Sequence, residues 1–257
     1  MGIIEKMRLD GKVSFITGGA RGIGKSVATA LAQAGSDIAL VDLDIEEAEK
    51  TAAEISELGV KAIAIKADVT VEEDVENMIK VIMDTFGKID VAMCNAGICI
   101  NVPAEEMTYE QFKKVIDINL NGVFLTAQAA AKVMLKQGRG SIINTASMSG
   151  HIVNVPQPQC AYNASKAGVI MLTKSMAVEF AKKGVRVNSI SPGYIGTELI
   201  TGRPDLMPLI DQWNAIAPMG RLGRPDELQA ICVYLAGDTS DFTTGADFSI
   251  DGAFTCF

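Results

Sequence analysis

Tyr162 and Lys166 stand four positions apart in the segment YNASK, a spacing that can support proton transfer. Residues at positions i and i+4 lie on the same face of an α-helix, so the phenol and the ammonium group are expected to be neighbours. A free phenol has a pKa of about 10, and use of the phenolate near pH 7 to 8 requires about 3 to 4 kcal/mol of stabilisation. A nearby ammonium ion has the charge to supply it. The same spacing also occurs in plain surface pairs, so its place in the fold decides its meaning.

A glycine-rich turn, TGGARGIGKS from Thr17 to Ser26, fits two phosphate-binding templates. Read as GxxxxGKS from Gly19 to Ser26, it has the spacing of a P-loop, which holds a nucleoside triphosphate and magnesium. Read as TGxxxGxG from Thr17 to Gly24, it has the glycine turn of a dinucleotide fold, where backbone amides and a helix N-terminus meet a pyrophosphate. A tight strand-to-helix turn without a ligand is the third interpretation.

Asp42 favours the dinucleotide interpretation. It ends an apolar run and lies 18 residues beyond Gly24, where a carboxylate can accept hydrogen bonds from an adenosine ribose and repel a 2′-phosphate. This predicts NAD rather than NADP. Arg21, directly before Gly22, is the opposing signal because a guanidinium group could pair with a 2′-phosphate. Asp42 as a simple turn former at the strand end remains an alternative.

These residues need an alternating set of strands and helices to position them. Short apolar runs predict seven strands, at Lys12–Thr17, Ile38–Asp42, Lys61–Lys66, Ile89–Cys94, Gly140–Ser147, Val185–Ile190 and Asp247–Asp251. Helical patterns between them end at glycines such as Gly35 and Gly59. Near-continuous apolar strands separated by helices indicate a parallel sheet covered on both faces. We therefore expect one doubly wound α/β domain over residues 1–257.

Composition narrows the function classes. The 257 residues include 31 acidic and 23 basic side chains, and the net charge of −8 argues against nucleic acid or anionic membranes as partners. No apolar run reaches the length of a membrane span, and MGIIEKMRLDGK lacks a signal-peptide core, so a cytoplasmic protein is expected. The single histidine and five scattered cysteines predict no metal site and no disulfide framework; the cysteines are interpreted as core or pocket-wall thiols. A stretch at 193–224 with three prolines predicts an insertion, either a substrate lid or a fixed surface excursion.

The chain resembles the short-chain dehydrogenase/reductase family from Leu9 to Gly252. The ordered motifs that carry the resemblance are TGGARGIG, Asp68-Val69, Asn95-Ala96-Gly97, Asn119, Ser147, YNASK and Pro192-Gly193. The resemblance implies that Tyr162 is the general acid/base, that Lys166 lowers the pKa of Tyr162 and holds the nicotinamide ribose, and that Ser147 hydrogen-bonds the substrate oxygen. Asn119 would hold a water that connects Lys166 to solvent, or alternatively form a helix-to-helix hydrogen bond.

The same resemblance implies the cofactor contacts. The glycine turn contributes Gly18, Arg21, Gly22, Ile23 and Gly24, and the ribose carboxylate is Asp42. Asp68 and Val69 would contact the adenine, and Asn95, Ala96 and Gly97 the riboses. The nicotinamide carboxamide and phosphates would meet the segment that contains Pro192, Gly193, Ile195 and Thr197. The cofactor is expected to be NAD, with NADP as the less favoured choice.

One departure concerns the segment between Ser147 and Tyr162, which spans 15 positions where many members of the family have 13. Ser149 is therefore a possible substitute for Ser147, although Ser147 lies directly at the strand end. The segment is similar to the branch that oxidises polyols and reduces ketoses such as sorbose. Its side chains could bind hydroxyl groups, or it could be a polar surface loop. The expected substrate contacts are Ser149, His151 and Gln159 from this segment, which also contains Asn154 and Gln157, and Tyr194 from the segment after Pro192.

The resulting hypothesis is an NAD(H)-dependent oxidoreductase that interconverts a polyol and a ketose by hydride transfer. A 3-oxoacyl-[acyl-carrier-protein] reductase using NADPH is the enzymatic alternative, and a P-loop nucleotide triphosphatase or a non-enzymatic dinucleotide sensor are alternatives of other classes. The resemblance also implies a homotetramer built on the helices that carry Asn119 and Tyr162. The apolar tail at 253–257 is expected to be buried against a neighbouring subunit or a pocket edge.

Overall fold

The computed structural model describes residues 2–202 and 204–256. Its seven strands are β1 (Val13–Thr17), β2 (Asp37–Asp42), β3 (Ala62–Lys66), β4 (Val91–Cys94), β5 (Gly140–Thr145), β6 (Val185–Pro192) and β7 (Asp247–Ile250). They form one sheet in the order β3-β2-β1-β4-β5-β6-β7, and every neighbouring pair is parallel. The predicted doubly wound fold is confirmed.

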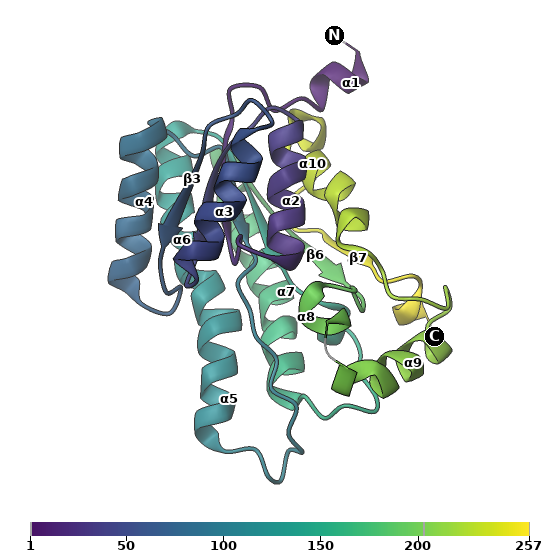
Figure 1. The fold of residues 1–257 in the computed structure, drawn as a ribbon. Coiled ribbons are helices and arrows are strands. Elements are labelled where there is room, and N and C mark those ends of the chain that lie inside the picture. The colour runs from purple at the N-terminus through teal and green to yellow at the C-terminus, as the bar shows by residue number, and fades with distance from the viewer. Residues whose placement is uncertain (1, 203, 257) are drawn as a thin grey trace.

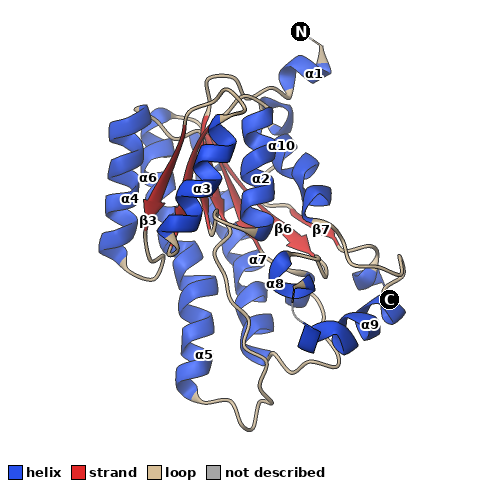
Figure 2. Ribbon diagram, in the orientation of Figure 1, coloured by secondary structure: helices blue, strands red, loops and turns tan. Residues whose placement is uncertain are grey.

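Apart from α1, which precedes β1, the helices lie between consecutive strands in the chain, and they cover both faces of the sheet (Figures 1 and 2). They are α1 (Ile3–Lys6), α2 (Gly22–Gln33), α3 (Ile45–Ser56), α4 (Glu72–Phe86), α5 (Tyr109–Ile116), α6 (Gly122–Gln137), α7 (Cys160–Phe180), α8 (Glu198–Thr201), α9 (Met207–Ile216) and α10 (Gln229–Ala236). Gly35 and Gly59, with φ of 107° and 88°, follow the ends of α2 and α3. They confirm the predicted glycine stops, because a positive φ favours glycine. None of the helices in the described residues is both long enough and apolar enough to cross a membrane.

Alternating residues of the strands pack into two separate hydrophobic cores, one on each face of the sheet. Phe15 of β1 packs with buried residues of α4, α6 and α7 on one face, while its neighbour Ile16 packs with those of α2, α3 and α10 on the other. Successive strand side chains point to opposite faces, so a run such as VSFIT must be apolar throughout when both faces are covered. All five residues of β1 are buried. This explains why the strands are readable as continuous apolar runs.

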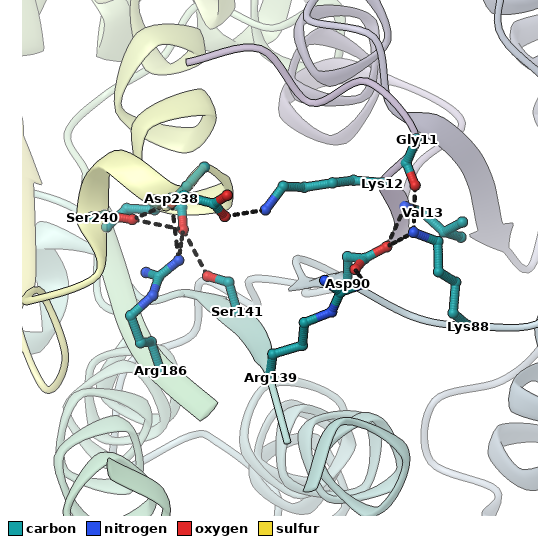
Figure 3. A network of polar contacts seen from close by, with 12 residues as sticks. Gly11, Lys12, Val13, Lys88, Asp90, Arg139, Ser141, Arg186, Asp238 and Ser240 are labelled. Atoms are coloured by element: carbon teal, nitrogen blue, oxygen red, sulfur yellow. Dashed lines mark hydrogen bonds and ion pairs between the residues drawn. The ribbon is translucent and has the colours of Figure 1, made fainter. Parts of the chain in front are cut away.

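A network of charged and polar contacts fastens the starting ends of the strands, at the edge of the sheet away from the glycine turn (Figure 3). The Asp90 carboxylate, 7% exposed, accepts a hydrogen bond from the Val13 backbone N–H at 2.9 Å and pairs with Lys88 at 2.9 Å. Lys12 pairs with Asp238, and Arg186 donates to the backbone oxygens of Leu235 and Gly237. These contacts tie β1, β4 and β6 to their surroundings and leave the opposite edge for the site.

Seven strand ends differ from the expected ones by one or two residues, and two of these differences have a clear local cause. β5 stops at Thr145 because Ser147 caps a short turn, its Oγ accepting a hydrogen bond from the Ser149 N–H at 3.1 Å. β6 continues to Pro192, which pairs with Ile250 and ends the strand because proline has no N–H for the ladder. The insertion at 193–224 folds as α8 and α9, lies beside the ends of β6 and β7, and returns at an isolated bridge between Ile195 and Gly223 (Figure 1).

Candidate active site

The glycine turn joins the end of β1 to the start of α2. Gly18 and Gly22 have φ of 63° and 55°, and a Cβ at Gly24 would lie 2.0 Å from the Gly18 carbonyl oxygen. Only glycine fits this closely packed path. α2 begins at Gly22 without a side-chain cap, so its first N–H groups have no side-chain acceptor from its N-cap residue. Such a helix N-terminus attracts an anion, and the turn fits the pyrophosphate of a dinucleotide.

The P-loop interpretation does not agree with the side chains of the same turn. The Lys25 ammonium group pairs with Glu54 at 2.6 Å, on the flank of α3. The Ser26 hydroxyl accepts a hydrogen bond from Gln229 at 3.1 Å. A P-loop needs this lysine on the phosphates and this hydroxyl on magnesium. Both are held by other elements here.

Asp42 and Arg21 lie at the rim of the turn. The Asp42 carboxylate ends β2 and accepts hydrogen bonds from the backbone N–H groups of Ala20 and Asp44, both at 3.1 Å. The Arg21 guanidinium group pairs with Asp44. Arg21 and Gly22 also line a surface hollow together with two carboxylates, Glu47 and Glu198. The surroundings of Asp42 are therefore acidic. Arg21, whose charge was the sequence signal for NADP, already has a carboxylate partner in Asp44.

The other residues expected to contact the cofactor line the same edge. Asp68 follows β3 and accepts hydrogen bonds from the N–H and hydroxyl of Thr70, while Val69 is buried beneath α6. The Asn95 side chain forms hydrogen bonds with the backbone of the glycine turn: its Nδ2 donates to the carbonyl oxygens of Thr17 and Gly18 at 3.2 and 3.1 Å. It therefore fixes the glycine turn against β4, and Asn95 remains partly exposed beside Ala96 and Gly97.

The segment after β6 returns to the glycine turn. A Cβ at Gly193 would lie 2.7 Å from the Asp251 Cα, so a side chain there would displace the backbone after β7. Ile195 is buried, and Thr197 stands beside Gly22, where an added Cβ would lie 3.3 Å from the Thr197 Cγ2. Pro192 ends β6 directly before this segment. The two ends of the expected cofactor site, 18–24 and 192–197, thus face each other across the sheet edge.

Tyr162, Lys166 and Ser147 meet at the carboxyl ends of β4 and β5. The Lys166 ammonium lies 5.6 Å from the centre of the Tyr162 ring and donates to the Thr145 carbonyl oxygen at 2.6 Å. The Ser147 hydroxyl forms a hydrogen bond with the Tyr162 phenol. Lys166 and Ser147 are 3% and 7% exposed, whereas Tyr162 is half-buried. The helix spacing and the strand end therefore bring a phenol, an ammonium and a hydroxyl group together.

Burial moves the proton affinities of the pair in opposite directions. It raises the pKa of Tyr162 to about 12, against the hydrogen bond with Ser147, and it lowers the pKa of Lys166 to about 8. Burial sets the direction of the Tyr162 pKa, and the lowering of this pKa by Lys166 stays a prediction. The physical reason is that loss of solvation disfavours the phenolate, while the ammonium group lies over the ring and bonds to Thr145.

Asn119 joins the site from a widened helix. Residues Asp117–Asn121 form a π-helical segment between α5 and α6, and Asn119 is fully buried there. Its Oδ1 accepts from the Ile98 N–H and its Nδ2 donates to the Ile98 carbonyl oxygen, both at 2.8 Å. A Cβ added at Gly97 would lie 3.2 Å from the Asn119 Oδ1 and 3.6 Å from the Lys166 Nζ. Asn119 is thus close to Lys166 and also bonds to Ser165 of α7 at 3.1 Å.

Of the four expected substrate contacts, three belong to one polar cluster. The Gln159 Nε2 lies 3.2 Å from the Ser149 Oγ and 3.0 Å from the Asn154 Oδ1. Asn154 in turn donates to the Tyr194 hydroxyl at 3.0 Å. His151 is different: its Nε2 lies 2.7 Å from the Asp247 Oδ2 of β7. Within residues 2–202 and 204–256, no hydrogen bond links His151 to Tyr162 or Gln159, and its bond with Asp247 ties it to β7 instead.

Comparisons with known proteins agree with this architecture. Residues 18–255 match a family model, adh_short_C2, described as Enoyl-(Acyl carrier protein) reductase. A crystal structure of a short-chain type dehydrogenase/reductase from Mycobacterium marinum superposes with a TM-score of 0.96, at 46% identity over 100% of both chains. The chain belongs to the short-chain dehydrogenase/reductase family.

Two curated relatives in this family are sugar-alcohol or ketose enzymes by name. One, from Yarrowia lipolytica, is named "Probable NADP-dependent mannitol dehydrogenase" and is 44% identical over 99% of this chain and 91% of its own. A sorbose reductase of Candida albicans is 42% identical over 99% of this chain and 90% of its own. The resemblance to the polyol and ketose branch of the family is confirmed, and the chain is a nicotinamide-dependent oxidoreductase acting on CH–OH groups.

Sequence reasoning missed several residues of this dehydrogenase site. The Cys99 thiol lies 3.8 Å from the Gln159 Oε1, and Trp213 of α9 stacks on Tyr194 with ring centres 4.1 Å apart. Phe254, 8% exposed, meets the edge of the Tyr194 ring at 5.3 Å. The tail was expected to be buried against a neighbouring subunit or a pocket edge; Phe254 is buried, whereas Ala253 and Cys256 are exposed and Phe257 lies outside the described residues. Cys99 could have been predicted near the site because it follows Gly97 by two positions. For Trp213, the only sequence indication was its location in the 193–224 insertion.

The cysteines divide into two groups. Cys94 and Cys232 are buried in the two cores, as expected, while Cys99, Cys160 and Cys256 are exposed, and all five are free thiols. For Cys160 and Cys256 the interpretation as core or pocket-wall thiols is wrong. Cys160 begins α7 with its side chain toward solvent, and its sulfur lies 3.9 Å from that of Met107.

Proposed function

We propose that this dehydrogenase interconverts the secondary alcohol of a polyol and the corresponding ketose, using NAD(H). The observation that supports it best is the position of Tyr162, Ser147 and Lys166, which lie between a glycine turn suited to a dinucleotide and a cluster of buried amide and hydroxyl side chains. A buried polar cluster beside the reacting group suits a substrate with several hydroxyl groups, because each hydroxyl buried without a partner costs about 1 to 3 kcal/mol. The names of the two curated relatives support the same substrate class.

The roles of the catalytic residues follow from their atoms. The Tyr162 phenol gives its proton to a carbonyl oxygen during reduction and takes it back during oxidation. The Ser147 hydroxyl, already bonded to that phenol, orients the same substrate oxygen and stabilises its developing charge. Lys166 supplies positive charge beside Tyr162, and Asn119 holds the loop at Ile98 and is close enough to Lys166 to share a water with it.

When bound, the nicotinamide supplies the hydride acceptor or donor, and its oxidised ring adds positive charge near the phenol. Residues on the sheet edge would hold it: Gly18, Arg21, Gly22, Ile23 and Gly24 at the pyrophosphate, Asp68 and Val69 at the adenine, Ala96 and Gly97 at the riboses, and Pro192, Gly193, Ile195 and Thr197 at the carboxamide. Because the phenol of the protein itself holds its proton tightly, reduction is favoured near neutral pH and oxidation at alkaline pH.

NAD is proposed over NADP because of the charges around Asp42. A 2′-phosphate would meet the Asp42 carboxylate, with Asp44 and Glu47 close by, and Arg21 is already paired with Asp44. The Yarrowia relative is named as NADP-dependent, so the cofactor is the part of the proposal that most needs a direct test.

On the substrate side, Ser149, Gln159 and Tyr194 are proposed to contact the hydroxyl groups, with Ser147 rather than Ser149 at the reacting oxygen. His151 was predicted as a contact as well; bonded to Asp247, it is proposed to act only by holding the 148–150 turn against β7. The segment 193–224 is proposed as a lid within a single domain of residues 1–257. A cytoplasmic homotetramer without nucleic acid or membrane partners completes the proposal.

The test is the absorbance of reduced nicotinamide with the purified protein, NAD or NADP, and sorbitol, mannitol, xylitol, galactitol and acyclic diols. Turnover of a polyol with NAD is expected, together with loss of turnover in Tyr162→Phe. In Asp42→Ala, kcat/KM with NADP is expected to rise relative to NAD by about tenfold, since one repulsive charge is removed. Reaction only with NADPH and acetoacetyl thioesters would replace the proposal with a 3-oxoacyl reductase. Unchanged activity in Tyr162→Phe would overturn the assigned mechanism.

A further inference from the structure

The Tyr194 hydroxyl group can donate its proton to a ligand. Its oxygen accepts one hydrogen bond from the Asn154 Nδ2 at 3.0 Å and another from the Gln157 Nε2 at 2.7 Å. A phenol offers two lone pairs and one proton, so both lone pairs are used. No acceptor for the proton is found among the residues the structure describes, and Tyr194 is only half-buried. The O–H bond is therefore free to point at an acceptor that enters the site.

The direction of one of these amides is fixed by the only tryptophan of the chain. The Trp213 Nε1–H donates to the Gln157 Oε1 at 3.1 Å. An indole N–H can only donate, so the oxygen of the Gln157 amide must face Trp213 and its NH₂ group must face Tyr194. Trp213 thus determines that Tyr194 accepts from Gln157 and keeps its own proton. Gln157 is 7% exposed, which strengthens these bonds by excluding water.

The Tyr194 ring is also held in place. It stacks on Trp213 with an angle of 10° between the ring planes, and the Phe254 ring meets it at 90°. These rings come from the segment after β6, from α9 and from the C-terminal tail, so three separate parts of the chain set the position of one hydroxyl group. Offset-stacked and edge-to-face contacts are the favoured arrangements of aromatic pairs.

A continuous set of hydrogen bonds places this hydroxyl on the substrate side of the catalytic group. Tyr194 is joined through Asn154 to Gln159, and Gln159 to Ser149. The Ser149 N–H donates to the Ser147 Oγ, which bonds to Tyr162. Tyr194 is thus several side chains away from the reacting phenol, where a substrate oxygen distant from the reacting carbon would lie.

We propose that Tyr194 is a specificity-determining residue that donates its hydroxyl proton to a substrate oxygen beyond the reacting carbon, and that Gln157 and Trp213 are positioning residues that keep this proton available. This inference rests on the proposed function and deepens it. It explains how a site whose chemistry needs only one hydroxyl group selects a substrate that has several.

The experiment compares substrates with and without a second oxygen in two variants. Tyr194→Phe keeps both ring contacts and removes the donor. Gln157→Glu keeps the tyrosine, but the new carboxylate can only accept, so it captures the Tyr194 proton while still accepting from Trp213. We expect the ratio of kcat/KM for sorbitol to kcat/KM for cyclohexanol to fall about tenfold in both variants, mainly through the KM for sorbitol. The pair cyclohexane-1,2-diol and cyclohexanol gives a second such ratio.

Controls and outcomes separate this inference from the proposed function. Tyr109→Phe makes the same chemical change at a tyrosine 72% exposed on α5 and is expected to leave both ratios unchanged. Unfolding temperatures report whether each variant folds. Unchanged ratios in Tyr194→Phe, or equal losses on both members of a pair, would overturn the role of Tyr194. Wild-type turnover of the cyclic diol but of no open-chain polyol would overturn only the proposed substrate, because the cyclic pair still measures the role of Tyr194. A wild-type enzyme indifferent to the second oxygen would overturn both.

Discussion

At the scale of single residues, the strongest constraint on this enzyme is the cost of burying charge. Lys166 is 3% exposed and keeps one clear hydrogen bond, to the Thr145 carbonyl oxygen. Loss of solvation lowers its pKa to about 8, from an ordinary value of 10.5. The folded protein therefore binds fewer protons than the unfolded chain between these two pH values, and linkage makes the free energy of unfolding rise with pH across that window.

Replacement of Lys166 by methionine should reveal the free-energy cost of burying the ammonium ion. Below pH 8 the wild type carries a buried ammonium ion that Lys166→Met lacks. The difference in unfolding free energy, wild type minus variant, is expected to rise by about 2 kcal/mol from pH 7 to pH 9.5. Denaturant unfolding at a series of pH values measures it. Lys174→Met, on the exposed side of the same helix, serves as the control with a flat difference. A wild-type advantage that shrinks as pH rises would contradict the linkage.

The reactivity of the Cys99 thiol provides a second test of desolvation, beside the same site. Burial raises the pKa of its thiol to about 11 although the residue is exposed, and its sulfur lies 3.8 Å from the Gln159 Oε1. The thiolate is the reactive form, so inactivation by iodoacetamide is expected to accelerate about tenfold per pH unit between pH 7.5 and 10. The rate is measured in a Cys160→Ser/Cys256→Ser background, and Cys99→Ser should abolish it. A rate that levels off near pH 9, around the ordinary thiol pKa of 9.0, would show that the thiol is not desolvated.

Single residues also show the limit of prediction from sequence. Tyr162 and Lys166 could be paired because four positions on a helix fix their neighbourhood, and Ser147 because it follows a strand. The partner of His151 is Asp247, 96 positions away, and no local pattern joins them. The direction of the Tyr162 pKa is hard to predict from sequence for a related reason, since desolvation depends on the packing of the whole site.

At the scale of elements, the π-helical segment Asp117–Asn121 makes room for Asn119 to leave the helix and bind a loop. The sequence placed Asn119 within a helical run, but the widened turn depends on a partner, Ile98, that is 21 positions earlier. Strands were predictable to within one or two residues at most ends because two-sided burial demands continuous apolar runs. The differences of two residues include the ends at Thr145 and Pro192, which depend on a cap and on a proline rather than on an apolar run.

Asn119→Ala should therefore destabilise the protein through the loop rather than through the helix. It leaves the N–H and carbonyl groups of Ile98 without their partner, and each unpaired buried group costs about 1 to 3 kcal/mol. We expect a loss of at least about 2 kcal/mol in the free energy of unfolding, measured by urea denaturation. Asn121→Ala is the matched control, because Asn121 is exposed in the same π-helical segment and bonds only to Asp117. Equal losses in the two variants would assign the effect to the helix itself.

At the scale of the whole molecule, the helix that carries Tyr162 and Lys166 also presents an apolar outer face. Met171 and Val178 of α7 are 61% and 82% exposed, and they are seven positions apart, on the same side of the helix. Phe124 of α6 adds an aromatic ring that is 40% exposed. The apolar stripe of α7, together with Phe124, is the surface that the proposed tetramer would bury. Association there would also brace α7, and with it the position of Tyr162.

Two charges in this stripe should break the assembly. The wild type is expected to have four times the chain mass of 27.2 kDa in size-exclusion chromatography with light scattering. Met171→Glu/Val178→Glu should shift it to dimers or monomers, because buried carboxylates without partners strongly oppose association. Leu58→Glu, at a position 43% exposed after α3, is expected to remain tetrameric. Activity should fall with dissociation, since α7 then loses its packing on one side. A wild type that elutes as a monomer with full activity would show that α7 holds the catalytic pair without a partner.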